Sequence, residues 1–227
     1  MAQGFSEETL QFLWGIRLNN SRDWFLAHKE QYLRSLYQPM KELGTEVQER
    51  VLCANAGLEL NLKVTRIYRD ARRVKYGGLY KDHLWFVLHA PREGEWTPEP
   101  AFYFEARPEE YEIGLGYWCP KAAFMGRYRQ KILREPEKLE KLARRLNRQK
   151  VFRLEGAEYK RPKGEVPPLL KPWFNRKELA ISAVYGYDEG SPFFTPALAD
   201  QIVDGIQWLM PFYRWFKEIE LEPDPNA

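Results

Sequence analysis

The sequence predicts an α+β fold in a single domain spanning residues 1–227. An N-terminal helical layer is expected, then a central, mainly antiparallel sheet, and further helices that cover it. Three features predict this fold. Apolar residues repeat at helical spacing through the first quarter of the chain, alternate with a period of two from about Leu62, and return to helical spacing after about Lys121. A length of 227 residues is compatible with one domain and one hydrophobic core.

Three helices are predicted in the first quarter of the chain. Ser6 suits the N-cap of the first helix, which Asn19 and Asn20 end. The second begins near Arg22, and Pro39 suits the first turn of the third. The residues at helical spacing are Leu10, Leu13, Trp14 and Leu18 in the first helix, Trp24, Phe25, His28, Tyr32, Leu33 and Leu36 in the second, and Met40, Leu43, Val47 and Val51 in the third.

The turn between the first two of these helices is rich in polar residues. Asn19, Asn20 and Ser21 are interpreted as capping and turn residues, because their side chains bond readily to nearby backbone groups. Trp24 and Phe25, which follow, are interpreted as core residues.

Four short strands are predicted at about 62–70, 83–90, 101–106 and 110–118, where β-branched and aromatic residues are enriched. No helix-length connection separates them, so antiparallel pairing between neighbours is favoured. The second strand has an apolar face and a mixed face. Leu84, Phe86 and Leu88 form the first, and His83, Trp85, Val87 and His89 form the second.

Helices are predicted again at about 121–133 and 136–149. The polar, proline-rich stretch 160–168 is interpreted as an ordered surface loop, because the segments on either side are too small to fold apart. A strand at about 178–187 and a helix that begins at Thr195-Pro196 complete the fold. Pro211 is expected to kink or interrupt that last helix.

Composition argues against several classes of protein. The 35 basic residues nearly balance the 32 acidic ones, so any strongly positive site has to be local. Cys53 and Cys119 are too far apart for a CxxC redox or zinc pattern, which favours reduced thiols in a cytoplasmic setting. There is no basic, then apolar, leader and no run of roughly 18 apolar residues, so we expect neither export by such a signal nor a membrane partner.

The segment from Arg66 to Asp82 concentrates basic and tyrosine side chains around Gly77-Gly78. Guanidinium groups suit carboxylate or phosphate, and a Gly-Gly turn lets backbone N–H groups approach an anion. The segment therefore predicts a site for a small anionic ligand, in which Asp70 orients an arginine. The predicted site residues are Arg66, Tyr68, Arg69, Asp70, Arg72, Lys75, Tyr80 and Lys81. The alternative interpretation is an internal ion-pair network, in which acidic residues neutralise these arginines.

Two other functions stay open. Asp70 with Glu105 or Glu112 would suit a metal-assisted phosphoesterase, although pairing of these acids with the many arginines is the favoured interpretation. Basic and aromatic residues also permit single-stranded nucleic-acid binding, which the near balance of charges does not favour. His83 and His89 would lie roughly 20 Å apart on a strand, too far to share a metal. No P-loop, GxSxG elbow or GxGxxG motif is present, so no cofactor is predicted, and enzyme activity and oligomeric state are left open.

Several spaced motifs carry a resemblance that spans nearly the whole chain. They are Arg17-x-Asn19-Asn20-x-Arg22-x-Trp24-Phe25, Arg66-x-Tyr68-Arg69-Asp70-x-Arg72 with Tyr80-Lys81, Gly116-Tyr117-Trp118-x-Pro120, and Lys160-Arg161-Pro162-Lys163-Gly164. In this order they resemble the conserved hypothetical family called domain of unknown function 2461. The resemblance implies a cytoplasmic, single-domain protein, and it brings no agreed activity and no agreed catalytic residues.

Overall fold

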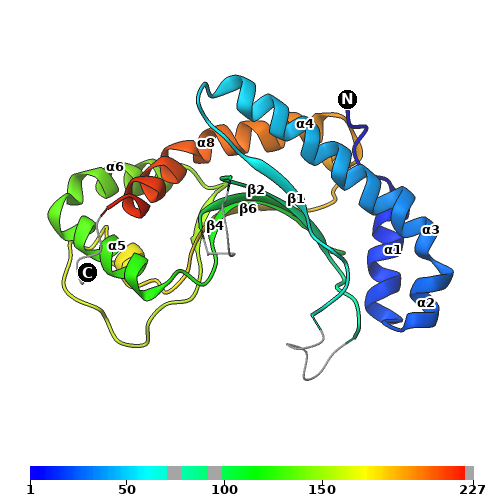
Figure 1. Ribbon diagram of the computed structural model, residues 1–227, viewed down its shortest axis with the longest axis horizontal. Coiled ribbons are helices and arrows are strands. Elements are labelled where there is room, and N and C mark those ends of the chain that lie inside the picture. Colours follow the sequence, from blue (N-terminus) through cyan, green and yellow to red (C-terminus); the bar gives the residue numbers. More distant parts are fainter. Residues whose placement is uncertain (71–77, 92–98, 223–227) are drawn as a thin grey trace. The chain divides into compact units, whose positions relative to one another are not determined.

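The computed structural model describes residues 1–70, 78–91 and 99–222, and it confirms the predicted α+β fold (Figure 1). Within these residues, six strands form one sheet in the order β1-β2-β3-β4-β6-β5. The strands are β1 (Asn61–Val64), β2 (Leu84–His89), β3 (Ala101–Ala106), β4 (Tyr111–Tyr117), β5 (Arg153–Glu155) and β6 (Leu179–Tyr185). The first four strands are neighbours in chain order and antiparallel, so the predicted meander is confirmed.

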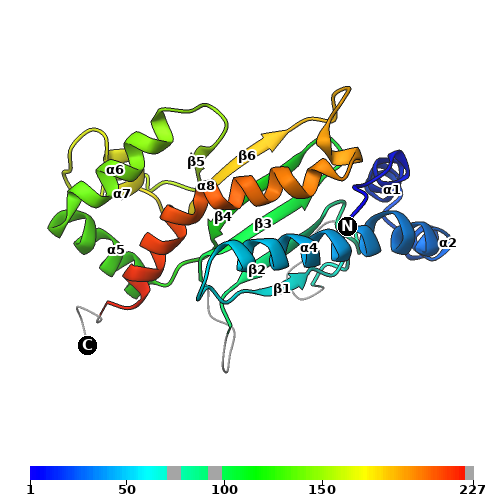
Figure 2. The same ribbon diagram turned by 90° about the horizontal axis from the view of Figure 1, so that it is seen from above.

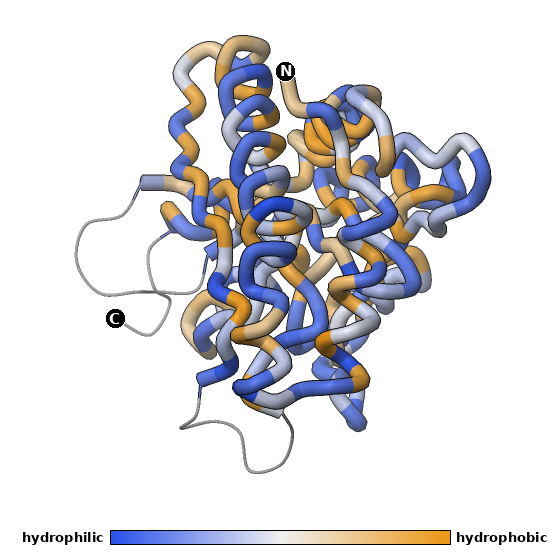
Figure 3. The backbone as a smooth tube through the Cα atoms, turned by 90° about the vertical axis from the view of Figure 1, so that its right-hand side faces the viewer, coloured by the Kyte–Doolittle hydropathy of each residue, from blue (hydrophilic) through white to orange (hydrophobic). Residues whose placement is uncertain are grey.

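Helices precede and follow this meander. They are α1 (Glu7–Leu18), α2 (Arg22–Ala27), α3 (Lys29–Gln31), the π-helix η1 (Tyr32–Tyr37), α4 (Gln38–Ala54), α5 (Ala122–Arg134), α6 (Pro136–Asn147), α7 (Lys171–Phe174), the 3₁₀-helix η2 (Pro192–Phe194) and α8 (Ala197–Glu220). Hydrophobic and hydrophilic residues alternate along the helical coils in Figure 3, as expected for helices with one buried face. Among the described residues, no helix is both long enough and apolar enough to cross a membrane.

The chain divides into two compact units. The first consists of Met1–Pro91, Tyr103–Ile113 and Val184–Gly205, and the second of Arg92–Phe102, Gly114–Ala183 and Ile206–Ala227. Strands β3, β4 and β6 and helix α8 contribute residues to both units. The single domain expected from the sequence therefore stays a prediction.

Helix α1 begins after Ser6, as predicted. The backbone N–H of Ser6 donates to Thr9 Oγ1 at 3.2 Å, which satisfies a backbone donor at the start of the helix. The predicted apolar face is wrong in two positions, because Trp14 and Leu18 are exposed and the buried residues include Phe12 and Ile16. Apolar residues at helical spacing surround much of this helix, so the stripe that is buried depends on tertiary contacts.

The second and third predicted helices are joined. From Lys29 to Ala54 the backbone is helical without a break, passing through the π-helix η1 before α4. Pro39 lies in the first turn of α4, and the stripe predicted for this helix is buried over β1 and β2 (Figure 2). Gly44 allows this close approach, because a Cβ there would lie 2.7 Å from a methyl carbon of Leu62.

The first predicted strand is too long. Strand β1 ends at Val64, after pairing antiparallel with β2 from Asn61↔His89 to Val64↔Phe86. Just beyond Val64 the Thr65 N–H still donates to the carbonyl of Trp85 in β2, at 2.9 Å, and the chain then runs beside the segment that leads into β2. In β2 itself the predicted alternation is confirmed, with one face buried and the other half-buried.

In the second unit the two predicted helices are confirmed as α5 and α6, and residues 160–168 are mostly exposed, as expected for a surface loop. The short elements β5 and α7 were not predicted, because three or four residues are too few to show a period. Helix α8 continues through Pro211, so of the two expected effects of this proline, a kink or an interruption, the interruption does not occur. Leu209, Met210 and Phe212 are buried beside the proline, and their packing offsets the lost backbone hydrogen bond.

Candidate functional site

The predicted site residues that the structure describes lie in the first unit, on two chain segments that run antiparallel just before β2. Tyr68 and Tyr80 form a β-bridge. On either side of it, the Arg69 N–H donates to the Leu79 carbonyl at 3.0 Å and the Lys81 N–H donates to the Ile67 carbonyl at 2.8 Å. We call residues 66–70 and 78–82 the basic ribbon.

The basic ribbon brings six of the predicted site residues together. They are Arg66, Tyr68, Arg69, Asp70, Tyr80 and Lys81. The other two, Arg72 and Lys75, lie outside the described residues.

Asn20 holds the ribbon against the turn between α1 and α2. Its side-chain oxygen accepts a hydrogen bond from the Tyr80 N–H at 2.9 Å, and its side-chain nitrogen donates to the Tyr80 carbonyl at 2.9 Å. The amide thus pairs with Tyr80 as a neighbouring strand would. Ser21 caps α2 as predicted, whereas Asn20 was wrongly interpreted as only a turn residue.

Gly78 is required for this contact. A Cβ at position 78 would lie 2.0 Å from Oδ1 and Cγ of Asn20, well inside the closest approach of real side-chain atoms. The two residues are far apart in the sequence, so glycine at this position answers a tertiary contact rather than a turn geometry.

Substituting Gly78 with alanine is therefore expected to lower the free energy of unfolding by about 1–2 kcal/mol, because the new methyl group displaces the Asn20 amide. Gly126→Ala is the matched control, since a Cβ there meets nothing within 4 Å and the residue lies inside α5. Alanine should stabilise that helix by about 0.5–1 kcal/mol. Urea unfolding of both variants measures the difference, and a loss of the same sign in both would contradict the steric explanation.

Aromatic packing joins the basic ribbon to Phe25 of α2. The buried ring of Tyr80 stacks on Phe25 with 4.3 Å between centroids, and the exposed Tyr68 meets Phe25 edge-on at 5.7 Å. Burial raises the pKa of Tyr80, and the neighbouring Tyr68 adds to this effect. The Tyr80 hydroxyl therefore stays protonated and neutral at physiological pH.

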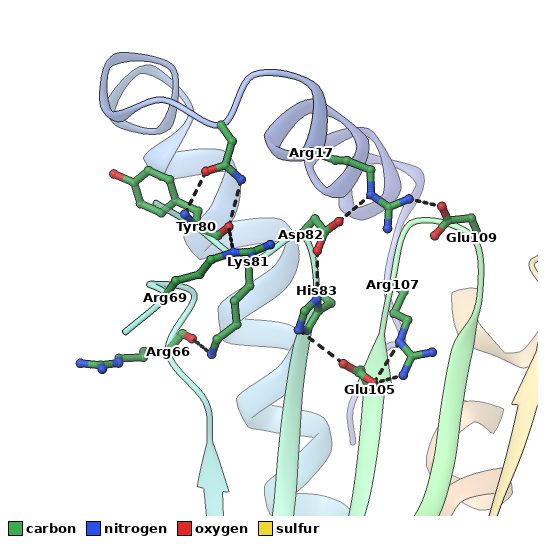
Figure 4. Close-up of polar contacts among 11 residues, drawn as sticks. Arg17, Arg66, Arg69, Tyr80, Lys81, Asp82, His83, Glu105, Arg107 and Glu109 are labelled. Atoms are coloured by element: carbon green, nitrogen blue, oxygen red, sulfur yellow. Dashed lines mark hydrogen bonds and ion pairs between the residues drawn. The ribbon is translucent and has the colours of Figure 1, made fainter. Parts of the chain in front are cut away.

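Two cations of the ribbon, Arg69 and Lys81, contact backbone oxygens, and Lys81 also contacts an aromatic ring. Arg69 Nε donates to the Tyr80 carbonyl at 2.7 Å, and Lys81 Nζ donates to the Arg66 carbonyl at 2.5 Å (Figure 4). Lys81 Nζ also lies 4.2 Å from the centroid of the Trp85 ring. Within the described residues, no carboxylate forms an ion pair with Arg66, Arg69 or Lys81.

The surroundings of Lys81 shift the pKa of its ammonium group. Burial lowers the pKa of this lysine, the charges of Arg66 and Arg69 lower it further, and Glu105 acts in the opposite direction. The ammonium group is thus in an environment that disfavours its charge, which is the condition that a bound anion would relieve.

The nearby acids are paired with other basic residues. Asp82 accepts from Arg17 Nε at 2.6 Å and lies 3.0 Å from His83 Nδ1, while Arg17 also pairs with Glu109 (Figure 4). Burial acts to raise the pKa of Asp82, but hydrogen bonds from Arg17 and His83 hold it below its usual value. This network is separate from the three cations of the ribbon.

Arg107 binds the acids of β3 and β4. Its guanidinium lies 2.5 Å from Glu105 and 2.8 Å from Glu112, and Glu112 also accepts from the Tyr103 hydroxyl. His83 Nε2 is 3.7 Å from Glu105. Sequence reasoning missed Arg17 and Arg107 as the partners of these acids, since nothing in the local pattern assigns an acid to one arginine among many.

The arrangement lends no support to a metal site built on Glu105 or Glu112. Both carboxylates contact Arg107, and in the parts of the chain that the structure describes no group of three or more His, Cys, Asp or Glu side chains is placed to hold a metal ion.

Fold and site together define an α+β protein whose sheet carries a short basic ribbon at one end. The family described as conserved hypothetical protein (DUF2461) matches residues 8–215, and the chain belongs to this family. The resemblance seen in the sequence is thereby confirmed. A search of curated proteins found no match. Two of the sequence motifs that carried the resemblance, around Asn20 and around Tyr80, are in direct contact in the structure.

Proposed function

We propose that the protein binds a small anion, bearing phosphate or carboxylate, on the basic ribbon. Arg66, Arg69 and Lys81 supply the charge, and the hydroxyls of Tyr68 and Tyr80 supply neutral donors. Asp70, Arg72 and Lys75 complete the set predicted from the sequence, with Asp70 orienting an arginine, and a cytoplasmic location is part of the same proposal.

The observation that carries this proposal is the environment of Lys81. Its pKa is lowered by burial and by two neighbouring arginines, and no described carboxylate pairs with any of the three cations. Gathering like charges in this way destabilises the unliganded protein. An anion bound among the three cations would be attracted to each of them and would offset their mutual repulsion. This electrostatic attraction is the expected source of the binding energy.

The donors are also held in place before a ligand arrives. One N–H group of Arg69 and one of Lys81 are anchored on the carbonyls of Tyr80 and Arg66, while Asn20 fixes the backbone of Tyr80. In the described part of the chain the other N–H groups of these two side chains form no hydrogen bond, and the Lys81 ammonium also lies over the Trp85 ring. Anchored donors lose little conformational entropy on binding, which favours affinity.

Anions are expected to stabilise the wild-type protein. Inorganic phosphate, pyrophosphate and citrate are the probes, and a ligand at 100 times its Kd adds about 2.7 kcal/mol to the free energy of unfolding. In the double variant Arg66→Ala, Lys81→Met we expect the affinity to fall at least about tenfold, a loss of about 1.4 kcal/mol. Thermal unfolding at increasing anion concentration measures both quantities.

The control removes two positive charges elsewhere in the same unit. Lys41 and Lys63 are exposed on α4 and β1, and Lys41→Met with Lys63→Met should bind the anion as the wild type does. A direct readout is the NMR titration of Lys81, whose pKa should rise when the anion binds. An anion-independent melting temperature, or equal losses in the two double variants, would refute the proposal. Tighter binding of a single-stranded oligonucleotide, with a steep dependence on salt, would favour the nucleic-acid alternative instead.

A further inference from the structure

The second unit contains a pocket of about 470 Å³ near the end of α6, between β5 and α7. This volume falls in the range of about 300–1,000 Å³ that is usual for small-molecule sites. Its apolar lining consists of Leu146, Phe152, Leu154, Leu169, Pro172 and Trp173. The pocket belongs entirely to the second unit and shares no residue with the basic ribbon.

The charged residues of the pocket are all basic. Lys150, Arg153 and Arg176 line it, and no aspartate or glutamate does. Arg176 pairs with Glu158 at 3.3 Å, but within the described chain Lys150 and Arg153 form no ion pair. Both of these side chains belong to exposed residues, so their charges face solvent at the edge of a hollow whose lining is part polar and part apolar.

The walls of the pocket are fixed by hydrogen bonds. The Gln149 side chain donates to the carbonyls of Leu146 and Phe152, each at 2.8 Å, and accepts from the N–H groups of Val151 and Phe152, each at 2.7 Å. A single amide thus holds the end of α6 and the start of β5 in one conformation.

Three further contacts hold the lining of the pocket in place. Arg176 donates to the Leu154 carbonyl at 3.3 Å and to the Gly156 carbonyl, which ties the segment after α7 to β5. Phe152 stacks on Trp208 with 4.7 Å between centroids and an interplanar angle of 2°. The hollow is therefore built into the packing of the unit.

We propose that this pocket binds an organic anion with an apolar body. Rings or branched chains of the ligand pack on Leu154, Leu169 and Pro172, the apolar residues of the lining that keep exposed surface. The carboxylate, sulfonate or phosphate group of the ligand meets Lys150 and Arg153 at the rim. A purely apolar ligand would leave these two cations unpaired, and a small inorganic anion would leave the apolar part of the lining exposed to water. A ligand with both an apolar body and an anionic group therefore fits best.

The probe is 8-anilinonaphthalene-1-sulfonate, and its uncharged relative N-phenyl-1-naphthylamine is the control ligand. The double variant Lys150→Ala, Arg153→Ala should bind the sulfonate at least about tenfold more weakly, as expected for two lost charge contacts. Its affinity for the uncharged relative should change by less than about twofold. Fluorescence titration gives both dissociation constants.

Lys141→Ala with Arg148→Ala is the matched charge control, because these two residues are exposed nearby and do not line the pocket. This variant should bind the sulfonate as the wild type does. Inorganic phosphate should not displace the sulfonate, which separates this pocket from the basic ribbon. Absence of binding to the wild type, or equal weakening in the two double variants, would overturn the proposal whether or not the ribbon binds anions.

Discussion

Replacing Arg107 with alanine is expected to lower the free energy of unfolding by about 3 kcal/mol. Removing one partner of a buried ion pair typically costs about 3–5 kcal/mol, because the remaining charge is left without compensation. The side chains of Glu105 and Glu112 are 14% and 11% exposed, but that of Arg107 is 34% exposed, so solvent can partly replace it. The expected loss therefore lies at the lower end of that range.

The pH dependence of this loss distinguishes charge from packing. In the wild type burial acts to lower the pKa of Arg107, but its hydrogen bond to Glu105 and the charges of Glu105, Glu112 and Glu110 raise it above its usual value. In the variant both carboxylates lack the guanidinium, and protonating a carboxylate removes a charge that the guanidinium no longer compensates, so the loss of stability should shrink as the pH is lowered. Urea unfolding at neutral and mildly acidic pH measures this change.

Arg34→Ala is the control for the arginine substitution. Arg34 pairs with Glu8 at 2.9 Å, but these side chains are 68% and 48% exposed. Exposed pairs contribute about 0–1 kcal/mol, and salt screens them. Equal losses in the two variants would mean that Glu105 and Glu112 do not depend on Arg107.

Replacing Asn20 with alanine should lower the free energy of unfolding by about 2–3 kcal/mol and weaken anion binding as well. The variant leaves the Tyr80 N–H without its partner, and its carbonyl keeps only Arg69. An unsatisfied buried backbone group costs about 1–3 kcal/mol. Since Tyr80 lies between Arg69 and Lys81 on the basic ribbon, loss of the Asn20 contact should also loosen the anchored donors.

Two comparisons test this explanation. Asn19→Ala removes a single exposed hydrogen bond to the Gly15 carbonyl, so it should cost less than about 1 kcal/mol and leave anion affinity unchanged. In the double variant Asn20→Ala, Gly78→Ala the loss of stability should be smaller than the sum of the two single losses. The Cγ and Oδ1 contacts at 2.0 Å are gone, and only the contact with the Cβ at position 20, at 2.5 Å, remains to be relieved. Strict additivity in a double-mutant cycle would show that the two residues act independently.

Strong local patterns account for the parts of the fold that the sequence predicted well. The stripe of α4 and the alternation of β2 recur over several turns or residues, and both elements are confirmed. Strand β5 and helix α7 are too short to show a period, and in α1 two overlapping apolar faces left the buried one undetermined. In each case the missing information is the position of a distant partner.

The candidate site, like the fold, was predicted only in part from the sequence. That basic residues gather around Gly78 is visible in the sequence, and their placement on adjacent segments follows from extended chain on both sides. Which distant residues these side chains bind cannot be read from the sequence. Asn20, which a purely local role as a turn residue would also explain, binds a residue 60 positions away, and Arg17 pairs with Asp82 across 65 positions.

The Tyr187 hydroxyl shares its proton between the carbonyls of Arg107 and Glu110, at 2.6 and 2.9 Å. These two contacts hold the turn between β3 and β4 in place. During translation, residues 103–113 leave the ribosome well before residues 184–205 of the same unit. At about 5–20 residues per second, the interval of 71 residues between 113 and 184 takes roughly 4–14 s. For that time the nascent hairpin lacks the hydrogen bonds from Tyr187, so the first unit completes its folding only after its last segment, residues 184–205, has been made.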